Sequence, residues 1–154
     1  MEWSQVINNP LFRNLPYKIE QNKYGRLLMS PASNKHGKME YRVGQVIEKG
    51  RQGGEIIVEC SIQTSDGVKV ADVAWASDAF IAAYGDATPY PRAPEICVEI
   101  VSPSNSDEEM RPKVDLYLAK GASEVWVVDE DGKARFFSVV GEMSESEMVK
   151  PARL

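Results

Sequence analysis

Two short apolar runs, each interrupted by a carboxylate, constrain the fold of this chain more than any other feature. They are Lys69–Trp75, with the sequence KVADVAW, and Pro94–Ser102, with the sequence PEICVEIVS. Runs of this length that are rich in Val, Ile and Ala predict buried strands. A buried carboxylate is destabilising unless a cation or hydrogen-bond donors meet it. Asp72 and Glu99 therefore predict a cation site within the sheet.

The alternation of side chains along a strand places Asp72 on one face of its strand with Val70 and Ala74. If the strand of Glu99 is the neighbour, the two carboxylates lie close together, and a proton or a cation must relieve their repulsion. Oxygen ligands favour Mg²⁺ or Mn²⁺ over zinc, and such a metal can activate water and stabilise a phosphate. The alternative is that Asp72 lies at an exposed strand end and Glu99 pairs with a lysine.

A lysine on a predicted helix could join this pair. The helix is expected to begin near Pro112, just after a turn at residues 102–104, and to end at Gly121. Lys113 and Tyr117 are four residues apart and share one face of it. From there Lys113 could orient or polarise an attacking water, although an ordinary surface lysine is the alternative.

Further candidates lie nearer the N-terminus. Glu20 lies among apolar neighbours in a predicted hairpin, and Glu40 follows His36 by one helical turn. Either acid could supply a third carboxylate. His36 is the only histidine of the chain, and a lone histidine near a helix start more often caps or packs than catalyses.

The rest of the pattern predicts an α/β (α+β) fold in which a mixed sheet is flanked by helices, in one domain over residues 1–154. Residues 1–16 are expected to form a loosely structured lead-in, and residues 141–154 a polar, frayed tail. Met39, Val43, Val46 and Ile47 form a core-facing helical stripe. The other expected elements are a hairpin at 17–30, a helix from Ser33 or Asn34 to Lys49, and strands at 55–62, 69–75, 95–101, 125–128 and 135–139.

Composition excludes several classes of protein. The 154 residues are 43% hydrophobic, which is enough for a core, and no apolar run approaches the length of a membrane span. The N-terminal residues lack the pattern of a secretory signal, so a cytoplasmic protein without membrane partners is expected. Cys60 and Cys97 fall within strands and predict buried free thiols, and with a single histidine they form no zinc ligand set.

Charge is unevenly distributed along the chain. The net charge of −5 argues against unspecific binding of nucleic acid. Residues 1–54, however, carry nine Lys and Arg against four acids, whereas the remainder carries nine against nineteen. A basic face on the N-terminal half is one interpretation, and a merely solvated surface is the commoner one.

Several segments, taken in order, resemble a known family. They are YKIE at 17–20, MSP at 29–31 with His36, VADV at 70–73, PEICVEIVSPS at 94–104, the stretch from Lys113 to Tyr117, and GASEVWVVD at 121–129. Together they resemble the bacterial restriction-endonuclease family called Uma-two, of the PD-(D/E)XK nuclease superfamily, over about residues 17 to 138. The combination is far more specific than any single motif.

The resemblance implies a restriction-endonuclease-like core: a mixed, mostly antiparallel sheet of four to five strands with a helix on each side. It also implies Mg²⁺-dependent cleavage of DNA phosphodiester bonds. Asp72 resembles the aspartate of the PD element and Glu99 the second acid, and the two would hold the metal. Glu20 resembles an early family glutamate, and Lys113 a lysine that has moved from strand to helix.

This sequence departs from the superfamily pattern at two positions. Ala71 replaces the proline before Asp72, and Val101 replaces the lysine of the E-x-K element. Activity would therefore depend on Lys113. The leading interpretation is a metal-dependent endonuclease, expected as a homodimer because paired active sites can cut both strands of a symmetric duplex. The alternatives are a nuclease-like binding or assembly module without turnover, and a hydrolase of another phosphoester.

Overall fold

The computed structural model describes residues 1–13, 15, 17–102 and 107–154. The turn predicted at residues 102–104 falls mostly outside these ranges. Within them, no helix is long and apolar enough to cross a bilayer.

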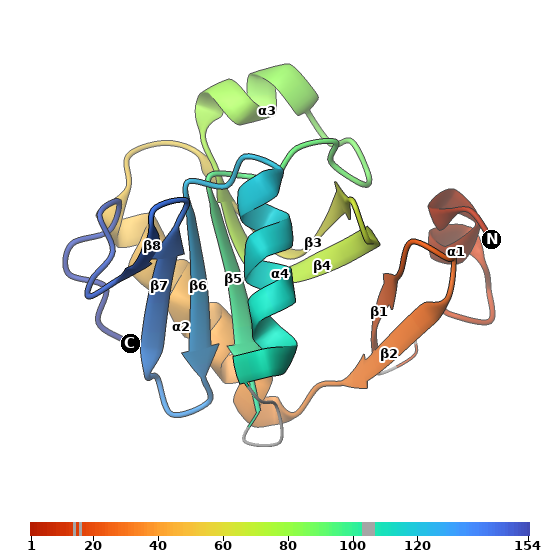
Figure 1. Cartoon of the computed structure of the whole chain (residues 1–154), viewed down its shortest axis with the longest axis horizontal. Coiled ribbons are helices and arrows are strands. Elements are labelled where there is room, and N and C mark those ends of the chain that lie inside the picture. Colours follow the sequence, from red (N-terminus) through yellow and green to blue (C-terminus); the bar gives the residue numbers. More distant parts are fainter. Residues whose placement is uncertain (14, 16, 103–106) are drawn as a thin grey trace.

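The centre of the fold is a six-stranded sheet whose strands follow one another in chain order (Figure 1). All neighbours are antiparallel except β5 and β6, which are parallel. A parallel pair needs a crossover connection, which helix α4 supplies. The predicted mixed, mostly antiparallel sheet is confirmed, with six strands rather than the expected four to five. Its strands are β3 (Glu55–Thr64), β4 (Gly67–Ala76), β5 (Ile96–Val101), β6 (Glu124–Asp129), β7 (Ala134–Ser138) and β8 (Gly141–Met143).

Helices cover both faces of this sheet (Figure 1). On one face α2 (Asn34–Gly50) packs through Met39, Val43 and Ile47, the predicted stripe, and Ser33 caps its N-terminus as predicted. On the other face lie α4 (Asp107–Ala119) and the short α3 (Asp78–Tyr84). Because side chains alternate along each strand, the same strands supply both cores.

The two cysteines are buried free thiols, as predicted. Cys60 and Cys97 are exposed by only 1% and 0%, within the core beneath α4.

The N-terminal segment forms a separate lobe beside β4. Strands β1 (Tyr17–Gln21) and β2 (Leu27–Pro31) form the predicted hairpin, preceded by helix α1 (Trp3–Asn8). The expectation of a loose lead-in is wrong for α1, because Trp3 and Val6 are buried against β4. Two apolar residues in a single turn are too few to produce a helical period in the sequence.

The start of α4 and the order of the C-terminal tail also differ from the predictions. Helix α4 begins at Asp107 rather than near Pro112, which lies inside it. The prediction placed the start too late because it relied on the preference of proline for the first helical position. The tail is not frayed, because it adds strand β8 and buries Ser146 and Val149. Its anchor is the buried Glu124 carboxylate, which accepts hydrogen bonds from Ser146 Oγ at 2.6 Å and from the Glu147 backbone N–H at 2.7 Å.

Candidate active site

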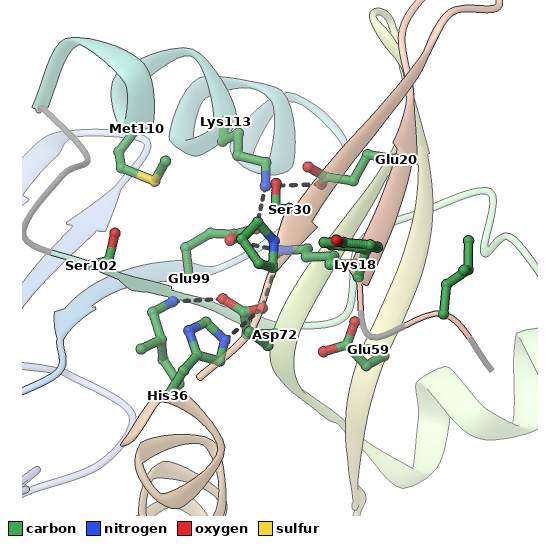
Figure 2. Close-up of a pocket in the computed structure, with 15 residues that line it drawn as sticks. Lys18, Glu20, Ser30, His36, Glu59, Asp72, Glu99, Ser102, Met110 and Lys113 are labelled. Carbon is green, nitrogen blue, oxygen red and sulfur yellow. Dashed lines mark hydrogen bonds and ion pairs between the residues drawn. The ribbon is translucent and has the colours of Figure 1, made fainter. Parts of the chain in front are cut away.

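A cavity of about 450 Å³ opens where the β1–β2 hairpin faces the strands β4 and β5 and the helices α2 and α4. Figure 2 shows charged side chains from all these elements converging in it. The charged residues that line it are Lys18, Glu20, His36, Glu59, Asp72, Glu99 and Lys113.

Asp72 and Glu99 lie opposite each other on adjacent strands. The paired register of β4 and β5 ends one residue before this position, at Val73 and Val98. Beyond it the Ile100 backbone N–H donates to Asp72 Oδ2. Both carboxylates are buried, with exposures of 1% and 3%. The alternative that Asp72 lies at an exposed strand end is therefore wrong.

The cation between the two carboxylates is the ammonium group of Lys18. Its Nζ lies 3.1 Å from Asp72 Oδ1 and 3.1 Å from Glu99 Oε2. Sequence reasoning did not select Lys18, although strand alternation places it on the same face of β1 as Glu20, and this was the available signal. The sequence does not show that β1 docks against β4, and this docking brings Lys18 to the two acids.

Lys113 approaches one of these carboxylates, Glu99, from α4, and it also contacts Glu20. Its Nζ lies 2.8 Å from Glu20 Oε2 and 3.1 Å from Glu99 Oε1. Glu20 also accepts a hydrogen bond from the Val70 backbone N–H at 2.7 Å, which holds the hairpin against β4. The buried Tyr117 hydroxyl donates to Glu99 Oε1 at 2.7 Å.

His36 and Glu40 form the third side of the site. His36 Nε2 lies 3.0 Å from Glu40 Oε1 and 3.3 Å from Asp72 Oδ1. The His36 side chain thus contacts two acids of the site, whereas its backbone N–H donates to the cap residue, Ser33. Hydrogen bonds to Asp72 and Glu40 raise the pKa of His36 to about 10, so the ring is protonated near neutral pH.

Glu59 is a second residue that sequence reasoning missed. It lies opposite Asp72 on β3, between the pairs Val58–Val73 and Cys60–Ala71, with a left-handed φ of 53°. Such a φ is uncommon outside glycine, and strained residues of this kind cluster at functional sites. Partial desolvation and the charge of Asp72 raise the pKa of Glu59 to about 7.

The pKa values of Asp72 and Glu99 are shifted in opposite directions. Burial alone would raise the pKa of Asp72, but the hydrogen bond from His36 and the charge of Lys18 hold it well below its usual range. Burial raises the pKa of Glu99 although Lys113 and Lys18 act against it. Burial by itself lowers the pKa of Lys18, but Glu99 and Asp72 outweigh it and hold that pKa well above its usual value. Perturbations of this kind in one cleft are typical of functional sites.

The charge balance of the site favours an added cation. When ionised, the carboxylates of Glu20, Glu40, Glu59, Asp72 and Glu99 outnumber the positive groups of Lys18, His36 and Lys113. Among the residues that the structure describes, one group could hold a metal ion: ligand atoms of His36, Glu40 and Asp72 lie within 4.8 Å of one another. This group shares Asp72 with the predicted pair but does not include Glu99.

The chain is similar to a known protein family and to a solved structure. The model of the Uma2 family, described as "Putative restriction endonuclease", matches residues 11–148. A crystal structure of a "putative nuclease belonging to DUF820" from Anabaena variabilis is similar to the chain with a TM-score of 0.66 at 17% identity, covering 88% of this chain and 86% of that one. At this identity the likeness concerns the fold alone. No curated protein gives a significant match.

Proposed function

The chain belongs to the Uma2 family, and on that basis we propose that it is a divalent-metal-dependent endonuclease that hydrolyses DNA phosphodiester bonds. One observation carries the proposal: the buried Asp72 and Glu99 carboxylates oppose each other in an open cavity, and the ammonium of Lys113 lies 3.1 Å from Glu99. Paired carboxylates with an adjacent lysine suit the hydrolysis of a phosphodiester.

The donor set fits Mg²⁺ or Mn²⁺. Carboxylate oxygens are the ligands that these hard cations prefer. When Glu59 and Glu99 are ionised, the excess of acids over positive groups leaves negative charge for a cation to neutralise. Asp72 and Glu99 would hold the ion, and Glu40 lies close enough to Asp72 to assist. His36 would have to lose its proton before its Nε2 could join them. A bound divalent ion supplies activation of water and stabilisation of phosphate charge.

Lys113 would act on the substrate directly. Glu20 and Glu99 hold its ammonium in the wall of the cavity, where it can orient the attacking water or stabilise charge on the phosphate. In this role Lys113 replaces the strand lysine that is absent at Val101. Tyr117 would position Glu99 through the hydroxyl hydrogen bond.

The proposal is tested by cleavage of supercoiled plasmid and of a labelled duplex, with Mg²⁺, with Mn²⁺ and with chelator. Asp72→Asn and Glu99→Gln keep the shape of each side chain and should reduce the rate by roughly a hundredfold or more. Asp115→Asn, an exposed acid on α4, makes the same change of charge away from the cavity and should cleave like wild type. Equal cleavage by wild type and Asp72→Asn would trace the activity to a contaminating nuclease.

Absence of cleavage of any DNA or RNA with any divalent metal would favour a second function, a binding or assembly module on the same fold. One observation favours it: the ammonium of Lys18 lies 3.1 Å from both Asp72 and Glu99 and offsets part of their charge. A panel of phosphoester substrates distinguishes both functions from the remaining alternative, the hydrolysis of a phosphoester other than DNA.

The proposed partner is DNA, and the proposed assembly is a homodimer that cuts both strands of a symmetric duplex. Light scattering coupled to size exclusion measures the assembly. A monomer at every protein concentration, with and without DNA, would exclude the dimer.

A further inference from the structure

Each of the two central carboxylates has one oxygen committed to other donors. Asp72 Oδ2 accepts a hydrogen bond from the Ile100 backbone N–H at 2.7 Å. Glu99 Oε1 accepts from the Tyr117 hydroxyl at 2.7 Å and contacts Lys113 Nζ at 3.1 Å. Asp72 Oδ1, which also lies 3.3 Å from His36 Nε2, and Glu99 Oε2 remain for a cation that bridges the two acids.

Lys18 holds these two remaining oxygens, at 3.1 Å each. Figure 2 shows its side chain reaching from β1 to the space between the acids. The side chain is only 11% exposed, and its ammonium is the one contact that the two acids share among the described ion pairs. A positive charge shared by two buried carboxylates favours the ionised form of both.

A divalent ion bridging Asp72 and Glu99 would need the oxygens that Lys18 occupies. An ammonium and a divalent ion cannot share that point, because both would lie within contact distance of the same atoms and repel each other. The ion therefore has to displace the ammonium.

We propose that Lys18 is a displaceable counter-ion, which neutralises Asp72 and Glu99 in the metal-free protein and competes with the divalent ion for the same two oxygens. The inference rests on the proposed function, since it presumes that Asp72 and Glu99 hold the metal. Through Lys18, the β1–β2 hairpin would then set how tightly the two carboxylates bind the divalent ion.

The first experiment measures Mn²⁺ affinity by calorimetry for wild type, Lys18→Met and Lys113→Met. Methionine keeps the apolar stem and removes the charge. Lys18→Met should bind Mn²⁺ about tenfold more tightly or better, because the competitor is gone. Lys113→Met loses the same charge next to Glu99 but occupies neither bridging oxygen, so its gain should be clearly smaller. Equal gains in both variants, or no gain in Lys18→Met, would overturn the inference.

A second measurement uses the unmodified protein and does not depend on the folding of a variant. Acetylation of each lysine is followed by mass spectrometry with and without saturating Mg²⁺. Lys18 should react slowly without the metal and several-fold faster with it, while the exposed Lys38 serves as the reference. Unchanged or slower modification of Lys18 under conditions where Mg²⁺ binds would overturn the displacement.

Asp72→Asn separates failure of this inference from failure of the proposed function. If wild type binds Mn²⁺, Asp72→Asn does not, and Lys18→Met binds no tighter than wild type, only the role of Lys18 is wrong. If neither wild type nor Lys18→Met binds Mn²⁺, the metal site itself is wrong, and both proposals are overturned.

Discussion

Tyr117→Phe isolates the contribution of one buried hydrogen bond to the fold and to the site. The tyrosine is 0% exposed, and its hydroxyl donates to Glu99 Oε1 at 2.7 Å. Phenylalanine keeps the ring in the core and removes only the hydroxyl. A hydrogen bond to a charged group contributes about 1.5–3 kcal/mol to the free energy of unfolding.

The expected loss lies near the lower end of that range, because Glu99 Oε1 keeps its contact with Lys113 at 3.1 Å. About 1.5–2 kcal/mol corresponds to a fall in Tm of about 3–8 °C for a chain of this size. Urea unfolding at pH 7 followed by circular dichroism measures the free energy, and calorimetry measures Tm.

Tyr41→Phe is the matched control. Tyr41 is 70% exposed on α2, so its hydroxyl should contribute less than about 0.5 kcal/mol. If Tyr117→Phe is as stable as Tyr41→Phe, the hydroxyl does not hold Glu99 in solution, and the positioning role of Tyr117 is refuted.

Three further predictions concern neighbouring contacts. Lys113→Ala should slow cleavage by roughly a hundredfold and Lys113→Arg should rescue it poorly, since a planar fork does not replace a compact ammonium; matched rate measurements check both. The pKa of His36 is raised from 6.5 to about 10, so the contribution of its charge to the stability of the fold should be complete below pH 6.5 and lost as pH rises to about 10. The difference in unfolding free energy between wild type and His36→Gln, measured across this range, tests it. A difference independent of pH would contradict the assignment. Glu124→Gln should weaken the anchoring of residues 141–154 by about 1–3 kcal/mol; faster limited proteolysis of the tail is the expected result, and an unchanged digestion rate would contradict it.

Local patterns in the sequence were sufficient for much of this fold. Alternation within Lys69–Trp75 and Pro94–Ser102, together with the family resemblance, predicted neighbouring strands that bring Asp72 and Glu99 together. The two strands do pair, and both acids contact Lys18. The hairpin and the capped helix α2 followed from turn residues and helical periodicity. These features depend on residues close together in the chain, where the backbone period determines which face a side chain occupies.

The partners across the cavity required the tertiary structure. Lys18 meets Asp72 and Glu99 only because β1 docks on β4, through contacts between residues about fifty positions apart such as Glu20 and Val70. The burial of the tail on Glu124 likewise depends on residues far apart in the chain. The sequence by itself determined which carboxylates face each other; the docking of the hairpin decided which cation lies between them, because no local period encodes how one lobe sits against another.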